Sequence, residues 1–210
     1  SHPYIYTQIN ALKNNNVQSF DRAFFAHIGL VFNSFCKSLA YYLTRVQINC
    51  QKGHFQRYKQ KLTWVSSEFT LLTNVALAIL GPSLKKRENI SARFGDILSN
   101  CYLITATLRE FENNPNQKDE DLVDYICNYC FNEIQIAREE IIINIGYLGF
   151  LLPLVKINPF SIKEKDSLNA KIVKNLENED YLKQMTSSLF ISNSKEDRLA
   201  KIQKAVKLNK

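Results

Sequence analysis

The chain has 210 residues, of which 45% are apolar, and it carries a formal net charge of +7. This length and apolar content are enough for a sizeable buried core, so we expect a globular protein. It has only six glycines and five prolines, and no long stretch alternates apolar with polar residues. These features exclude an architecture based on β-sheets and predict an almost entirely α-helical fold.

The positive charge belongs to the first half of the chain. Residues 1–110 hold 13 Lys and Arg against 5 Asp and Glu, a net charge of +8, whereas residues 111–210 hold 14 against 15, a net charge of −1. A basic half can face nucleic acid, an anionic membrane, a phosphorylated ligand or an acidic partner domain. Because the sequence carries no helix-turn-helix or RNA-binding signature, we expect no nucleic-acid partner.

The first half predicts one short and two long helices. A short helix should follow Pro3 and end in the Asn run "KNNNV", because Pro favours a first helical turn and Asn favours turns. Long helices are expected over about 19–46 and 54–80, the second stopped by Gly81 and Pro82. The expected inward residues of the 19–46 helix are Phe20, Phe24, His27, Val31, Phe35, Leu39 and Leu43.

The second half predicts two more long helices. One has apolar residues spaced 3, 4, 3, 4 and 3 apart, a bundle seam made of Phe94, Ile97, Cys101, Ile104, Leu108 and Phe111. The other should run over about 119–144 with acidic residues in its first turn. Four long helices joined by short breaks predict an up-and-down bundle over 1–160 with shorter helices at both ends. The more charged residues 161–210 should be short peripheral helices or a partly mobile tail.

The longest uncharged runs are too short to span a bilayer, so no transmembrane helix is expected. The most apolar segment, 141–157, has two interpretations. It can pack in the core, or it can dip into a membrane interface beside the basic half of the chain. The membrane-contact candidates are Tyr147, Leu148, Phe150, Leu151 and Lys156.

The residue types that carry metal or acid–base chemistry are scattered. Cys127 and Cys130 have the spacing of redox and zinc sites, but no second pair or nearby His supports a metal, so packing is favoured. The three histidines, His2, His27 and His54, form no i, i+4 pair, and His27 is expected to pack on an apolar face. No metal, cofactor or catalytic residue is predicted within this chain.

The glutamates near 133–140 are candidates for a carboxylate that abstracts a proton. They are Glu133, Glu139 and Glu140, with Arg138 between them in the sequence. Most of these side chains point away from the expected seam. A solvated face is therefore the preferred interpretation.

The stretch 78–103 holds the other polar candidates. Lys85, Lys86 and Arg87 stand just beyond a helix stop, where cations and a helix N-terminus can bind phosphate. The favoured interpretation is instead that these cations cover the turn or face another domain. Arg93, Gly95 and Asp96 lie beside the seam. Glycine inside a helix is costly unless another backbone approaches, so we expect a tight contact there, with Arg93 in an ion pair.

Two blocks carry a family resemblance. "HPYIYTQINALKNNNVQSFDRAFFAHIGLVF" and "LGPSLKKRENISARFGDILSNCYL" resemble the C-terminal extension of bacterial long-chain acyl-CoA dehydrogenases of fatty-acid β-oxidation, in which an "LGGSLKRRExISARLGDILSxLYL"-like block recurs. Weaker similarity continues through "KDSLNAKIVKNL" to the end. Pro82 replaces the family's second Gly and Lys86 its Arg, so the positive charge is kept.

The resemblance implies a role inside a larger enzyme. In these enzymes the catalytic core, with its FAD and its catalytic Glu, precedes the extension, so no catalytic or flavin-binding residue maps onto this chain. The implied role is a scaffold that docks on its own core, with long-chain acyl-CoA as the substrate of the full-length enzyme. The implied location is cytoplasmic, with the anionic inner membrane surface as a second docking candidate. The alternative is a module that binds the phosphates of coenzyme A through Lys85–Arg93.

Overall fold

The computed structural model describes residues 3–44, 55–146, 149, 166–187, 198, 201, 202 and 205. All regular structure within these residues is helical, which confirms the predicted fold class. The chain divides into two compact units, Ser1–Glu164 and Lys165–Lys210, and each is described by itself.

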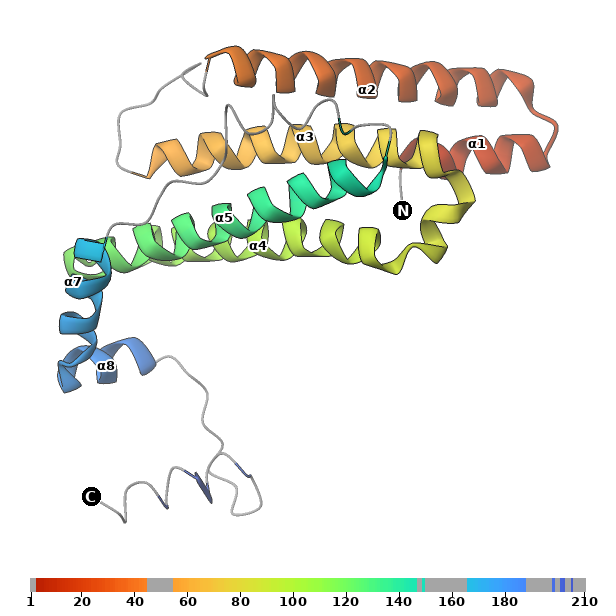
Figure 1. Ribbon diagram of the computed structural model, residues 1–210. Helices are drawn as coiled ribbons and strands as arrows, with labels where there is room; N and C mark the ends of the chain where they lie inside the picture. The colour runs from red at the N-terminus through yellow and green to blue at the C-terminus, as the bar shows by residue number, and fades with distance from the viewer. Residues whose placement is uncertain are drawn as a thin grey trace. The chain divides into compact units, whose positions relative to one another are not determined.

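The first unit is built from long helices that run in alternating directions along the chain (Figure 1). Neighbours in sequence pack together, α1 on α2, α2 on α3 and α4 on α5, which is the predicted up-and-down arrangement. The elements are α1 (Pro3–Lys13), α2 (Val17–Thr44), α3 (Gln56–Leu80), the 3₁₀ helix η1 (Gly81–Lys86), α4 (Glu88–Asn113), the 3₁₀ helix η2 (Gln117–Asp119) and α5 (Glu120–Asn144).

The turn between α1 and α2 uses its asparagines. Asn15 adopts a positive φ of 50°, a conformation that Asn tolerates better than most residues. The side chain of Asn16 accepts a hydrogen bond from the Ser19 N–H at 3.0 Å. This bond satisfies one of the free amides in the first turn of α2.

The corner between α3 and α4 is sharper than a simple stop. Gly81 has φ +51°, and its N–H donates to the Leu77 carbonyl, which ends α3. The chain then makes the 3₁₀ turn of η1, with Pro82 near its start, before α4 begins at Glu88. Glycine suits this corner because it adopts a positive φ at little steric cost.

The hydrophobic core of this unit lies among α3, α4 and α5. The predicted seam of α4 faces it, with Ile97, Ile104 and Leu108 fully buried and Phe94, Cys101 and Phe111 partly buried. On α5, Cys127, Phe131, Ile134 and Ile141 are almost completely excluded from solvent. From α2, the residues that reach this core are the partly buried Tyr41 and Tyr42.

The predicted inward face of α2 was wrong for four of its seven residues, while Phe20, His27 and Val31 are half-buried. Among the residues expected to face inward, Phe24, Phe35, Leu39 and Leu43 are exposed. The buried residues of α2 are instead Ala23, Ser34 and Ser38. Because α2 has large apolar residues on one side and small residues on another, the spacing of apolar residues alone did not show which side packs inward.

Over its described stretch 166–187, the second unit contains two short helices, α7 (Asp166–Leu176) and α8 (Glu179–Thr186). The Asn178 side chain caps α8 by accepting hydrogen bonds from the N–H groups of Asp180 at 3.0 Å and Tyr181 at 3.2 Å. Ile172 and Tyr181 are the buried apolar side chains of these helices.

Candidate functional site

The most prominent apolar surface of the described residues lies along α2, and we call it the α2 outer face. Its side chains are between 43% and 70% exposed. No acidic or basic residue belongs to it. It consists of Phe24, Phe25, Ile28, Phe32, Phe35, Leu39 and Leu43. Contiguous exposed apolar surface of this kind is typical of an interaction site.

The opposite side of α2 holds the helix to its neighbours through small and polar groups. His27, which was expected to pack on an apolar face, is half-buried, and its Nε2 lies 2.6 Å from Oδ1 of Asn74 on α3. The His27 ring also stacks against Tyr4 of α1, with ring centroids 6.4 Å apart. This polar contact ties α1, α2 and α3 together.

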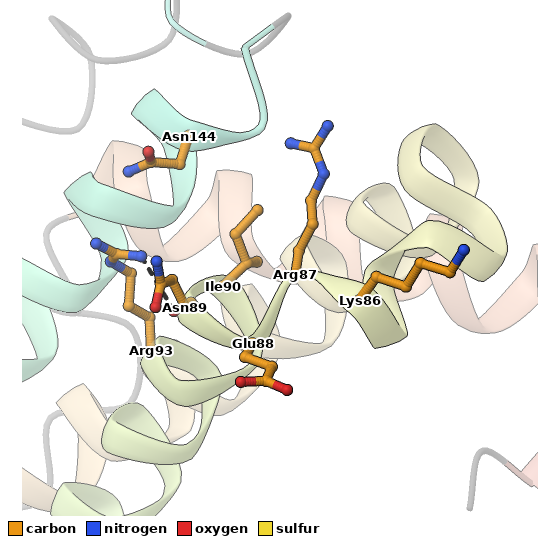
Figure 2. Close-up of a pocket in the computed structure, with 7 residues that line it drawn as sticks. All are labelled: Lys86, Arg87, Glu88, Asn89, Ile90, Arg93 and Asn144. Atoms are coloured by element: carbon orange, nitrogen blue, oxygen red, sulfur yellow. Dashed lines mark hydrogen bonds between the residues drawn. The ribbon is translucent and has the colours of Figure 1, made fainter.

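A basic corner surrounds the start of α4 (Figure 2). An open hollow of about 440 Å³ is lined by Lys86, Arg87, Glu88, Asn89, Ile90, Arg93 and Asn144. No side chain caps the N-terminus of α4. The Ile90 N–H already donates to the Arg87 carbonyl at 3.0 Å, so the amides that remain for an anion are those of Glu88 and Asn89. Positive charge and free amides at a helix start are the features that bind phosphate.

The predicted cation cluster is only partly brought together at this corner. Lys85, Lys86 and Arg87 are all exposed, and Lys85 does not line the hollow. Figure 2 shows that the side chains of Lys86 and Arg87 point in different directions, and that Arg93 lies on the other side of Arg87 from Lys86. The cations therefore do not converge on one point.

Arg93 has its own partners. Its Nε donates to Oε2 of Glu140 on α5 at 2.5 Å, and its Nη1 donates to the Asn89 carbonyl at 3.0 Å. The predicted close packing at Gly95 and Asp96 was wrong: both residues are exposed, and a Cβ added to Gly95 would meet nothing within 4 Å. Gly95 lies one position away from the buried side of α4, so no other backbone approaches it.

A buried polar cluster joins α3 to α5, and sequence reasoning missed it. Arg138 Nε donates to Oε1 of Glu68 at 2.5 Å, and Arg138 Nη1 donates to Oε1 of Gln135 at 3.1 Å. The Arg138 guanidinium also lies over the Trp64 ring, 5.8 Å from its centroid. Burial raises the pKa of the Glu68 carboxyl, and the neighbouring Arg138 partly opposes this effect.

The expected solvated face around Arg138 was therefore wrong for Arg138 itself, which is buried. Glu133, Glu139 and Glu140 are half-buried rather than fully exposed. The position of Arg138 at the spacing of the apolar seam of α5 was the signal that could have revealed its burial.

The cysteine pair behaves as packing. Cys127 and Cys130 are buried, and burial raises the pKa of the Cys127 thiol to about 12 and also raises that of Cys130. Over the described part of the chain, no group of three His, Cys, Asp or Glu side chains is placed to hold a metal ion. High thiol pKa values make these cysteines poor nucleophiles at neutral pH.

Some candidates lie outside the described residues. These are the membrane-contact candidates Tyr147, Leu148, Phe150, Leu151 and Lys156, together with His2 and His54. By length and composition alone, the helical segments Val17–Thr44 and Gln56–Lys86 are sufficient to cross a membrane, a test that core helices of soluble proteins also pass. The expectation of no such helix considered only uncharged runs and is not supported by this measure.

Comparison with known families settles what kind of domain this is. A family model described as "Acyl-CoA dehydrogenase, C-terminal, bacterial type" matches residues 1–210. The chain belongs to this family. No solved structure matches it significantly. As an acyl-CoA dehydrogenase C-terminal domain, it is part of an oxidoreductase in its full-length context and associates with its own catalytic core.

Family membership implies FAD in the full-length enzyme. The basic corner of this C-terminal domain does not fit a flavin, because an isoalloxazine ring needs apolar walls and Ile90 is the one apolar residue among those described around the hollow. The residues around this hollow of the acyl-CoA dehydrogenase domain are therefore unsuited to hold the flavin ring.

Proposed function

We propose that this domain is the docking scaffold of an FAD-dependent long-chain acyl-CoA dehydrogenase, the enzyme of the first, α,β-dehydrogenating step of fatty-acid β-oxidation. In this proposal the catalytic Glu and the flavin reside in the core, and the chain alone is inactive. The domain holds the core in its working form. The family match over residues 1–210 and the exposed α2 outer face support this role.

The observation that carries the proposal is the α2 outer face. Its large side chains include Phe25 and Phe32, each 67% exposed, whereas the buried residues of the same helix are small. When a partner covers exposed aromatic side chains of this size, the free energy falls by about 25 cal/mol per Å² of apolar surface removed from water. A helix arranged in this way favours association with another protein surface.

The basic first half of the domain suggests a second contact. Its net charge of +8 over residues 1–110 suits an anionic surface, and we propose a cytoplasmic enzyme that associates peripherally with the inner membrane. This contact uses charge rather than the α2 outer face. It should therefore weaken as the salt concentration rises.

The test is the activity of a separately produced core with and without this chain. We expect added chain to raise the rate of palmitoyl-CoA oxidation, followed by flavin bleaching and by reduction of an electron-accepting dye. The chain alone should bleach nothing. An unchanged rate and an unchanged thermal stability of the core would contradict the scaffold role. Sedimentation with phosphatidylglycerol vesicles at low and high salt tests the membrane contact separately.

A second candidate function is binding of the phosphates of coenzyme A at the basic corner. The hollow beside Arg87 and Arg93, above the uncapped start of α4, favours it. The divergence of the cations ranks it below docking. Calorimetric titration with CoA up to about millimolar concentration distinguishes the two, because weak phosphate binding still gives heat there. Heat that disappears in Arg87→Glu but not in Lys59→Glu would support it, and no heat would exclude it.

A further inference from the structure

The α2 outer face has the spacing of a helix-packing seam. Phe25, Ile28, Phe32, Phe35 and Leu39 follow one another at intervals of 3, 4, 3 and 4 residues. Apolar residues at these intervals form the contact line between helices that cross at a shallow angle of about 20°. The stretch from Phe24 to Leu43 has a length of roughly 28 Å at about 1.5 Å per residue, enough for five turns of a partner helix.

Between Phe24 and Leu43 the borders of this seam are uncharged. The five seam residues are flanked by Phe24 and Leu43, which belong to the same outer face, and by Gly29, Val31 and Cys36. In a two-helix contact exposed to water, the flanking positions usually carry Glu and Lys. Because they are apolar or small here, the partner should cover the flanks as well, as a helix that belongs to a larger packed surface does.

The hairpin of α1 and α2 is only lightly involved in the core of its own unit. The fully buried residues of that core come from α3, α4 and α5, and α2 adds the partly buried Tyr41 and Tyr42. The side of α2 that faces the bundle buries Ala23, Ser34 and Ser38, which have little apolar surface. The larger apolar side chains of the hairpin are thus available to a partner outside the unit.

The occupant of the face follows from these features and from the chain connection. A lipid surface does not require apolar residues at 3–4 spacing. A helix that lies in a membrane interface is also rich in Lys and Arg. In α2, Lys37 is the sole charged residue between Phe24 and Thr44. A second copy must be recruited from solution. The catalytic core precedes α1 in an enzyme whose C-terminal domain this is, and such a tether supplies an effective concentration on the order of millimolar.

We propose that the α1–α2 hairpin is a docking arm, and that the α2 outer face packs lengthwise along an uncharged, apolar helix of the enzyme's own catalytic core. This proposal rests on the scaffold function above and assigns the face and the partner chemistry to it. The core-facing helix needs apolar residues at the same 3–4 spacing. Acidic residues would be unfavourable, because no cation on the face could pair with them.

The chain carries its own probe of this contact. Cys36 is an exposed thiol on the border of the face, whereas Cys127 and Cys130 are buried. We expect iodoacetamide to modify Cys36 in the 210-residue chain, and the purified core to slow that reaction by at least about tenfold when the complex is saturated. Peptide mass spectrometry follows each cysteine separately, and the rate without core serves as the reference.

Two other additions distinguish the rival occupants. Vesicles of phosphatidylethanolamine and phosphatidylglycerol should leave the Cys36 rate unchanged, and so should raising the concentration of the chain by itself. Protection by vesicles alone would assign the face to lipid, and protection by concentration alone would assign it to a second copy. The proposal is overturned if either of these results is obtained and the bound core leaves Cys36 unprotected.

Matched variants separate this inference from the scaffold function. Phe32→Glu changes the α2 outer face, and Leu98→Glu changes a side chain of α4 that is 55% exposed. Both sites are exposed, so both variants should fold, as circular dichroism can verify. We expect Phe32→Glu to weaken binding to the core by at least about tenfold and Leu98→Glu to leave it within about twofold.

If the core binds both variants equally, the docking arm is wrong while the scaffold function survives. If the unmodified chain does not bind the core at all, both fail.

Discussion

Arg138 and Glu68 form an ion pair inside the bundle, and the pair links α5 to α3. The Arg138 Nε lies 2.5 Å from the Glu68 Oε1, and the two side chains are 4% and 12% exposed. Gln135 also accepts a hydrogen bond from the guanidinium, which lies over the Trp64 ring. Because the pair is almost dry, each charge depends on the other to remain in the core.

Removing one partner should therefore be costly. We expect Arg138→Leu to lower the free energy of unfolding by about 3–5 kcal/mol, because it leaves the Glu68 carboxyl buried without its cation. Urea denaturation followed by circular dichroism measures this change. The control is Lys59→Leu, which removes a solvent-exposed pair with Glu112 and should cost no more than about 1 kcal/mol. Equal effects of the two changes would contradict the burial of the Arg138 pair.

The two glycines near the α3–α4 corner should respond in opposite directions. Gly81→Ala should destabilise the chain by about 1 kcal/mol or more, since its φ of +51° is unfavourable for a residue with a Cβ. Gly95→Ala should stabilise it by roughly 0.5–1 kcal/mol, since Gly95 is exposed within a helix with open space around its Cα. Thermal unfolding of both variants is the measurement. A large loss of stability in Gly95→Ala would restore the close contact first expected there.

Lys61 should make stability depend on pH. Its ammonium is buried over the Phe131 ring, and burial first, then the nearby Arg57, lowers its pKa to about 8. Between pH 8 and about 10.5 the unfolded chain then binds more protons at this site than the native one, so the Lys61 contribution to stability increases as pH rises. Below pH 8 the lysine is charged in both states, and its contribution does not change.

Comparison with Lys61→Met isolates this effect from other titrating groups. The unfolding free energy of the natural chain, relative to Lys61→Met, should increase between pH 7 and pH 10. Denaturation curves of both proteins at each pH give this difference. The difference is needed because burial also raises the pKa of Tyr58 and of Cys101. Above about pH 9 these two groups lower the stability of the unmodified protein as pH rises, which opposes the effect of Lys61. A difference that is independent of pH would show that Lys61 is solvated.

How much of this molecule could be predicted depended on how many sides of a helix carry apolar residues. The longest regular apolar spacing of α4 lies on one side, and that side faces the core as expected, whereas Leu98 and Tyr102 on another side are exposed. α2 has two candidate sides, and the choice between them was decided by tertiary neighbours, since α1 and α3 pack on α2 and the residues it buries are Ala23, Ser34 and Ser38. Local periodicity contains no information about those neighbours.

The polar residues of the interior were harder still. Arg138 follows Ala137 on the seam of α5, but its partner Glu68 lies 70 positions earlier in the chain. A charged residue in a seam normally suggests a solvated position, and only the partner on α3 makes its burial favourable. The corner at Gly81 could be predicted because Gly and Pro determine backbone geometry locally. The orientations of the cations at the following turn could not, since exposed Lys and Arg side chains are directed by neighbours beyond the local sequence.

The central claim is that this domain associates with its own acyl-CoA dehydrogenase core through the α2 outer face. Sedimentation velocity of the 210-residue chain mixed with the purified core, in parallel with the same mixture containing Phe32→Glu, tests it most directly. We predict a complex with one chain per core that persists in high salt, because the contact is apolar, and that is lost in Phe32→Glu. Independent sedimentation of the unmodified chain and the core at the highest concentrations reached would contradict the account.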